Sequence, residues 1–234
     1  MNDLYIQGFK IDWNEISRES YLRNISAIKE IEDFEFRKPV TFFTGENGSG
    51  KSTLLEAIAV SYGFNAEGGT KNYNFSTYDS HAELHEAMRL IKGYRRANGG
   101  FFLRAESFYN VATKEKEYET DRMYHEKSHG ESFLALAQNQ FHGNGVYILD
   151  EPEAALSPQR QLTLMLEINR CMEEGAQFLI ATHSPVLMAF PNAEILTFDH
   201  GSIRTCEYED TDAYKITKMF MIDRDRIMSK LFAK

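Results

Sequence analysis

Residues 45–52 read GENGSGKS and match the pattern G-x-x-x-x-G-K-S of a phosphate-binding P-loop. The run before them, PVTFFT at 39–44, is rich in β-branched and aromatic residues, which is typical of a buried strand. The run after them, residues 53–60, has apolar residues at helical spacing. In this setting of strand, turn and helix, backbone N–H groups and the helix dipole bind phosphate. The motif predicts a nucleotide site formed by Gly45, Glu46, Asn47, Gly48, Ser49, Gly50, Lys51, Ser52 and Thr53.

Composition sets the class of protein. A chain of 234 residues that is 42% hydrophobic is long enough for one α/β domain with a core. The net charge of −9 argues against a strongly basic nucleic-acid platform. Residues 214–234 carry six basic and two acidic side chains, which we interpret as a solvated helix face. Two cysteines, no signal peptide and no apolar run of about 20 residues indicate a cytoplasmic protein without membrane insertion.

The order of predicted elements favours an α/β fold. We expect an antiparallel, β-rich N-terminal portion over residues 1–44, followed by a mostly parallel sheet with helices on both faces. Residues 80–97 read as a helix, with Leu84, Ala87, Met88 and Ile91 on one face. Residues 1–234 are expected to form one domain, with a helical lobe inserted at about 65–140. Further strands are expected at 100–105, 146–150, 177–182, 194–199 and 203–208, and helices at 158–171 and 211–232.

A second motif follows an apolar strand about 100 residues after the P-loop. Residues 146–149 read VYIL, and Asp150 and Glu151 come directly after them. Ligands bind at the carboxyl ends of parallel strands, so these carboxylates are expected beside the P-loop. Lys51 is expected to reach the β- and γ-phosphates, while Ser52 and Asp150 hold Mg²⁺. Glu151 is placed to polarise the attacking water.

A third polar group follows the apolar strand at 177–182. His183 comes next in the sequence ATHSP, at the same predicted edge of the sheet. A histidine at a strand end is commonly an ordinary polar residue with satisfied hydrogen bonds. The strand order and the two preceding motifs favour a contact with the γ-phosphate instead.

Together, these motifs resemble those of ABC-type ATPases. Within that superfamily, they are more similar to stand-alone bacterial ATPases related to SMC and RecF proteins than to transporter subunits. Residues 128–131, SHGE, resemble the signature motif; residues 150–157, DEPEAALS, resemble the Walker B segment and D-loop; His183 matches the switch histidine. The resemblance implies an ATP-sandwich homodimer in which Ser128 and Gly130 of one copy complete the site of the other. A helix expected at 133–140 would present its N-terminus to the γ-phosphate.

Three residues depart from the family pattern. His129 replaces the first glycine of the signature, and Ser157 stands where the D-loop commonly has aspartate. Glu106 stands where the family has the Q-loop glutamine. Glu106 is either a further contact of the Mg²⁺ shell or an ordinary acid at a strand end. For adenine stacking, Tyr5, Phe9 and Tyr21 are candidates, although aromatic residues are more often part of the core.

The expected activity is hydrolysis of ATP to ADP and phosphate, with ATP and Mg²⁺ bound and Lys51, Glu151 and His183 as the catalytic residues. The expected setting is DNA maintenance or defence, or a motor coupled to a partner, with nucleic acid or an effector protein as the partner. Two alternatives remain. The first is the nucleotide-binding subunit of an ABC transporter, against which Glu106 and Glu131 argue. The second is a nucleotide-gated switch with little turnover.

Overall fold

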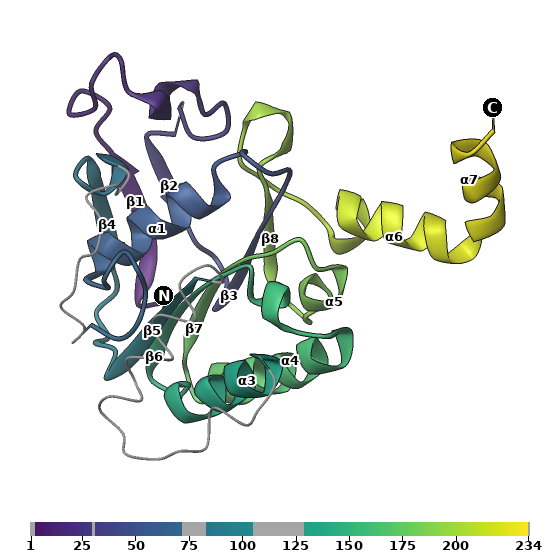
Figure 1. Ribbon diagram of the computed structural model, residues 1–234. Helices are drawn as coiled ribbons and strands as arrows, with labels where there is room; N and C mark the ends of the chain where they lie inside the picture. The colour runs from purple at the N-terminus through teal and green to yellow at the C-terminus, as the bar shows by residue number, and fades with distance from the viewer. Residues whose placement is uncertain (1–2, 30, 72–82, 105–128, 234) are drawn as a thin grey trace.

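A computed structural model describes residues 3–29, 31–71, 83–104 and 129–233 and arranges their strands in two sheets (Figure 1). The smaller sheet is antiparallel, in the order β2-β1-β4. The larger sheet has the order β5-β6-β7-β3-β8-β9, and only β9 in it is antiparallel. The strands are β1 (Ile6–Ile11), β2 (Asp33–Glu35), β3 (Val40–Thr44), β4 (Met88–Lys92), β5 (Gly99–Arg104), β6 (Gly145–Asp150), β7 (Gln177–Ala181), β8 (Glu194–Thr197) and β9 (Arg204–Thr205). The predicted α/β fold is confirmed.

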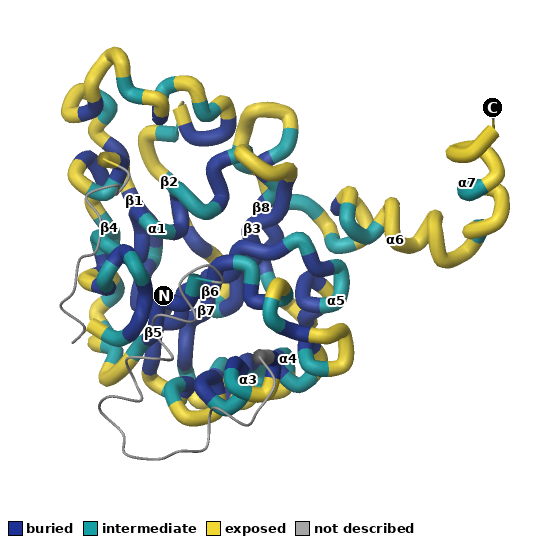
Figure 2. Tube along the Cα trace, viewed as in Figure 1, coloured by how far each residue is buried: buried dark blue, intermediate teal, exposed yellow. Residues whose placement is uncertain are grey.

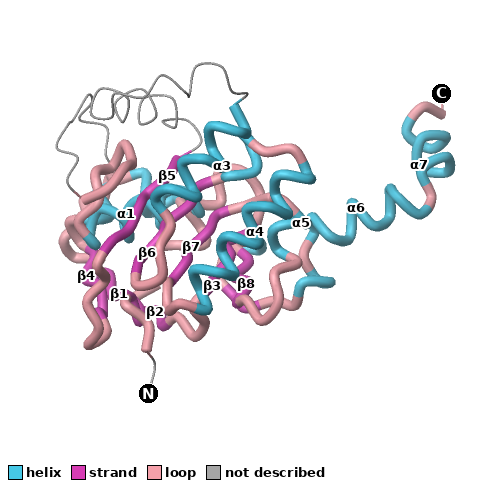
Figure 3. Tube along the Cα trace, turned by 90° about the horizontal axis from the view of Figure 1, so that it is seen from below, coloured by secondary structure: helices cyan, strands magenta, loops and turns pink. Residues whose placement is uncertain are grey.

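Helices cover both faces of the larger sheet. One face packs against α1 and the smaller sheet, and the other against α3, α4 and α5 (Figure 3). The described helices are α1 (Lys51–Tyr62), α3 (His129–Gln140), α4 (Pro158–Glu173), α5 (Pro185–Met188), α6 (Asp212–Ile222) and α7 (Arg224–Leu231). Short 3₁₀ turns lie at Tyr21–Asn24, Glu83–His85, Pro152–Ala155, Asp199–Gly201 and Tyr208–Asp210.

The alternation of side chains along β3 explains the two layers. Phe42 faces the helices α3 to α5, whereas its neighbour Phe43 faces α1 and the smaller sheet. Both are fully buried, as expected for a strand with hydrophobic residues on both sides. Tyr147 of β6 packs against Phe141 and Phe178 with ring centroids 4.6 and 4.9 Å apart. Two hydrophobic cores therefore pack on the two faces of the central sheet.

One buried side chain joins the two sheets. Gln177, at the start of β7, accepts a hydrogen bond from the Ile6 backbone N–H at 2.9 Å. Its amide group donates to the Ile6 carbonyl at 2.8 Å. Gln177 is only 1% exposed, so it satisfies both polar groups of a strand residue where water cannot. This pairing fixes β1 against the central sheet.

One element prediction is wrong and another needs correction. Instead of a helix over 80–97, Glu83–His85 forms a 3₁₀ turn and Met88–Lys92 forms β4. Pairing of β4 with β1 supplies its backbone hydrogen bonds, and this long-range ladder outweighs the helical spacing of the apolar residues. The single helix expected at 211–232 is broken at Asp223, whose φ of −136° is not helical.

The predicted lobe at 65–140 is described only in part. Residues 72–82 and 105–128 lie outside the described residues. Between them, β4 joins the smaller sheet and β5 joins the larger one. The described strands of this stretch therefore belong to the sheets, and the helical lobe stays a prediction.

The last two helices project from the body. Figures 1 and 2 show α6 and α7 extending away from both sheets, with almost all of their surface exposed. Neither helix contains a buried residue. Several exposed apolar side chains lie here, among them Met221 at 76% and Phe232 at 74%. None of the helices in the described ranges combines the length and apolar character needed to span a bilayer.

Candidate functional site

The predicted site residues gather at one edge of the larger sheet. Strands β6, β7, β3 and β8 are parallel neighbours, so their carboxyl ends meet at this edge. The P-loop follows β3, Asp150 ends β6, His183 follows β7 and Asp199 follows β8. Open α/β sheets bind ligands at this edge. The topology thus brings together residues more than 150 positions apart in the chain.

The P-loop wraps around the Lys51 ammonium group. Lys51 Nζ donates to the carbonyl oxygens of Gly45 at 2.7 Å and Glu46 at 2.9 Å. Burial lowers the pKa of Lys51, and the nearby carboxylates of Glu151 and Asp150 oppose this effect. The amine is therefore held inside the loop, with negative charge close by.

Two contacts fix the shape of the loop from outside. Gly50 has φ of 101° and lies so close to Ile25 and Ile28 that a Cβ atom would come within 2.6 Å of either side chain. At the other end of the loop, Asp199 Oδ1 accepts a hydrogen bond from the Glu46 N–H at 3.1 Å. The segment before β2 and the turn after β8 therefore hold the P-loop in place.

The two carboxylates after β6 have different surroundings. Asp150 is 8% exposed, and its Oδ1 accepts a hydrogen bond from Ser52 Oγ at 2.9 Å. The Glu151 side chain is 41% exposed, and its Oε1 lies 3.6 Å from His183 Nε2. Glu151 has φ of 50° and ψ of 52°, a left-handed conformation that is strained for a residue with a side chain. Strain of this kind is concentrated at functional sites.

The polar groups at this edge fit a triphosphate with Mg²⁺. Gly50 precedes α1 without a side-chain cap, so the first N–H groups of the helix are left for an anion. Ser49 Oγ and His183 Nε2 are buried and form no hydrogen bond to the described residues. Within the described part of the chain, no three His, Cys, Asp or Glu residues gather as a metal site. A pair such as Ser52 and Asp150 suits Mg²⁺, which takes most of its remaining ligands from water and phosphate.

A hollow beside the P-loop suits the base of a nucleotide. It has a volume of about 500 Å³ and is lined by Tyr21, residues 24–27, residues 46–49 and residues 198–201. Tyr21 is 55% exposed there, whereas Tyr5 and Phe9 are buried in the core at 2% and 0%. Of the three aromatic candidates for stacking, only Tyr21 lines this hollow.

The signature segment is described from its second residue onward. Ser128 and Glu106 lie outside the described residues, so their predicted roles stay predictions. The helix α3 begins at His129, and a Cβ atom on Gly130 would lie 2.9 Å from the Ala155 carbonyl oxygen. Close contact of this kind requires glycine, and it places the start of α3 against the turn at 152–155. Glu131 pairs with Arg160 of α4 at 3.1 Å and holds the same helix end.

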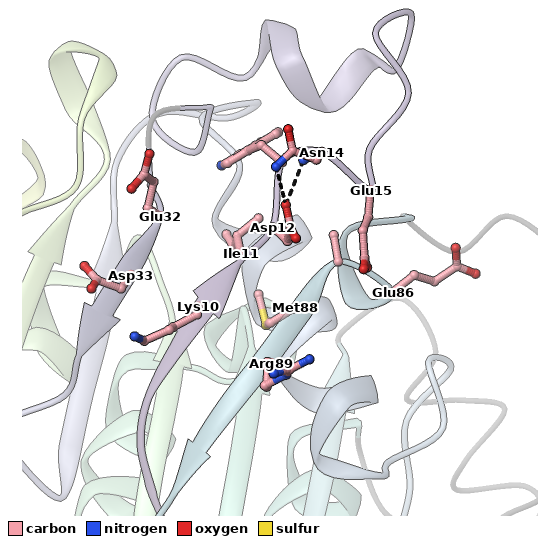
Figure 4. Close-up of a pocket in the computed structure, with 12 residues that line it drawn as sticks. Lys10, Ile11, Asp12, Asn14, Glu15, Glu32, Asp33, Glu86, Met88 and Arg89 are labelled. Atoms are coloured by element: carbon pink, nitrogen blue, oxygen red, sulfur yellow. Dashed lines mark hydrogen bonds between the residues drawn. The ribbon is translucent and has the colours of Figure 1, made fainter.

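A larger hollow of about 600 Å³ lies over β1 and β4 and shares no lining residue with the P-loop (Figure 4). Asn14 donates to Asp12 Oδ1 there through its backbone N–H at 3.0 Å and its side-chain amide at 2.9 Å. Five carboxylates line it against two basic groups, so it is poorly suited to phosphate. The acidic and basic residues are Asp12, Glu15, Glu32, Asp33, Glu86, Lys10 and Arg89.

Comparison with known proteins identifies the family. Residues 21–166 match the AAA_23 family, described as an AAA domain. The chain belongs to the AAA_23 family. The match includes the P-loop and the Asp150–Glu151 motif of this AAA domain and ends before His183.

The chain is also similar to a curated ATP-binding protein and to solved structures. It is 29% identical over 203 residues to the arabinose import ATP-binding protein AraG of Pseudomonas syringae pv. syringae (strain B728a). That match covers 76% of this chain and 39% of AraG, so the chain spans about two fifths of the relative's length.

Among solved structures, an SMC head bound to the C-winged helix domain of ScpA has a TM-score of 0.50 at 15% identity, covering 87% and 98% of the two chains. The SMC head domain of Thermotoga maritima has a TM-score of 0.49 at 14% identity, covering 87% and 100%. The ATP-binding cassette MJ1267 has a TM-score of 0.49 at 18% identity, covering 92% and 99%. The first of these likenesses shows that the chain shares the fold of an SMC head.

Three residues at this sheet edge were not predicted from the sequence to belong to the site. Asp199 holds the P-loop backbone, and Glu153 and Gln161 contact the segment around His183. The position of Asp199 directly after a strand of the same parallel sheet was a usable signal. The other two contacts join segments that the sequence does not show to be adjacent.

Proposed function

We propose that this AAA_23 protein binds and hydrolyses ATP, and that a second copy completes its site. The observation that carries the proposal is the meeting of the P-loop, Asp150, Glu151 and His183 at one sheet edge, with Ser52 bonded to Asp150 at 2.9 Å. Phosphoryl transfer relies on positioning and electrostatic stabilisation, and these groups supply both.

Each residue then has a specific role. The loop from Gly45 to Thr53 and the N-terminus of α1 hold the phosphates, and Lys51 neutralises their charge. Ser52 and Asp150 would hold Mg²⁺, which would neutralise charge that develops on the phosphates. Glu151 orients the attacking water and accepts its proton, and His183 contacts the γ-phosphate. Tyr21 stacks on the adenine from the hollow beside the P-loop.

The exposure of the catalytic groups supports completion by a second copy. The side chains of Glu151 and His183 are 41% and 40% exposed, which is high for a site that must exclude water. We propose that Ser128 and Gly130 of one copy cover the γ-phosphate of the other.

For the partner of this protein, we propose only a broad class. One relative is named an import ATP-binding protein, and one solved SMC head is bound to a winged-helix domain. We favour work in DNA maintenance or defence, coupled to nucleic acid or to an effector protein, over a transporter. Salt-dependent stimulation of ATP hydrolysis by DNA would support the first setting. Co-purification with a membrane complex would support the transporter.

The direct test is ATP hydrolysis by the purified protein and by Glu151→Gln. The variant keeps the size and shape of the side chain but cannot accept the proton. We expect it to bind ATP as the parent does and to hydrolyse it at least about 100-fold more slowly. Glu173→Ala, on the exposed part of α4, is the control and should hydrolyse normally. Equal rates for the parent and Glu151→Gln would remove Glu151 from its proposed role.

A further inference from the structure

One side chain joins the turn after Glu151 to the loop that carries His183. Glu153 Oε1 accepts a hydrogen bond from the His183 backbone N–H at 2.6 Å. The two residues are 30 positions apart and belong to segments that follow different strands, β6 and β7. The donor is the backbone N–H of His183, so this contact fixes the chain at the histidine without using its imidazole.

A second buried contact runs parallel to the first. Ser184 Oγ donates to Gln161 Oε1 at 2.5 Å, and Gln161 Nε2 donates to the Leu156 carbonyl at 3.1 Å. Gln161 and Ser184 are 7% and 6% exposed. A buried polar group that loses its partner is costly, so breaking either of these bonds would lower the stability of the protein. The 152–157 turn and the 182–184 loop are thereby tied together at two points.

The second carboxylate oxygen of Glu153 indicates that this residue serves the function of the site more than the stability of the fold. Glu153 Oε2 is buried and forms no hydrogen bond to the described residues. A buried carboxylate oxygen without a partner lowers stability, so a shorter polar side chain would serve the fold alone as well or better. Glu153 lowers the stability of the fold and lies two positions from the strained residue Glu151. This combination is typical of functional sites.

We propose that Glu153 is a positioning residue that transmits movement of the 152–157 turn to His183, with Gln161 and Ser184 as the second connection. The inference rests on the proposed ATP hydrolysis. The start of α3 packs on Ala155, so a second copy that engages this part of the chain also presses on the turn that contains Glu153. Through the two connections, that pressure shifts the His183 loop. In this proposal Glu153 takes no direct part in the chemistry and acts through His183.

The test compares Glu153→Ala with Glu153→Gln, which keeps an oxygen that can accept from the His183 N–H. Glu173→Ala on exposed α4 is the matched control. The first measurement needs no nucleotide and follows hydrogen exchange of the peptide that contains His183. We expect exchange at this amide to become about tenfold faster in Glu153→Ala and to stay near the parent rate in Glu153→Gln.

The second measurement separates kcat from KM. Glu153→Ala should lower kcat about tenfold with KM for ATP unchanged, and Glu153→Gln should restore most of the loss. If Glu153→Ala does not fold, Gln161→Met breaks the second connection and should show the same pattern. Unchanged exchange in Glu153→Ala, or an equal loss of kcat in the Ala and Gln variants, overturns the proposal. A parent protein without ATPase activity refutes the proposed function instead, and the exchange result still decides whether the contact exists.

Discussion

Replacing Gly50 by alanine is expected to destabilise the protein through two separable effects. Gly50 has φ of 101°, and a residue with a side chain in this left-handed region costs about 1–2 kcal/mol. The new Cβ atom would also lie 2.6 Å from side-chain carbons of Ile25 and Ile28. Overpacking of this kind adds about 1–3 kcal/mol. The expected total of about 2–5 kcal/mol is a large part of the usual stability of about 5–15 kcal/mol.

Gly48→Ala is the matched control for this prediction. Gly48 lies in the same loop with φ of 78°, but a Cβ atom there would meet nothing within 4 Å. Gly48→Ala should therefore lower the free energy of unfolding only by the backbone strain, about 1–2 kcal/mol. Urea unfolding of the parent and both variants, without nucleotide, measures the difference. Equal losses for Gly48→Ala and Gly50→Ala would refute the claim that the segment at Ile25 and Ile28 packs on the P-loop.

Three further predictions concern the rest of the chain. Gln177→Leu leaves both polar groups of Ile6 unpaired and should destabilise by about 2–5 kcal/mol in urea unfolding; a loss below 1 kcal/mol would contradict the bridge between the sheets. Removal of residues 218–234, which include no buried residue among those described, should leave the melting temperature within about 2 °C. A fall of 5 °C or more would show that the projecting helices pack on the body. Burial raises the pKa of Cys171 to about 11. The stability that its neutral thiol contributes is therefore fully present below about pH 9 and is lost as the pH rises through 11. Between pH 8.5 and 11 the parent should lose about 1–3 kcal/mol more stability than Cys171→Val, and an equal loss would contradict the shift.

The meeting of the P-loop, Asp150 and His183 at one sheet edge could be predicted because each part has a local sequence signal. The P-loop is a contiguous motif, and Asp150 and His183 each follow a continuous apolar run that forms a buried parallel strand. Parallel strands place their carboxyl ends at one edge, so the meeting of these residues follows from the strand prediction.

Elements stabilised by distant partners could not be predicted in this way. The stretch at 88–92 has helical spacing, yet pairing with β1 makes it a strand. The break at Asp223 has no glycine or proline to signal it. The bonds from Gln177 to Ile6 and from Glu153 to His183 span 171 and 30 positions, and sequence periodicity carries no information about them.

The central claim is that one chain carries half of an ATP site. The most direct measurement is the molar mass of Glu151→Gln in solution with ATP and Mg²⁺, compared with ADP and Mg²⁺. The predicted result is a dimer with ATP and a monomer with ADP, because in the proposed dimer the γ-phosphate lies between Lys51 of one copy and Ser128 of the other. A monomer with ATP, in a variant shown to bind ATP, would contradict the claim.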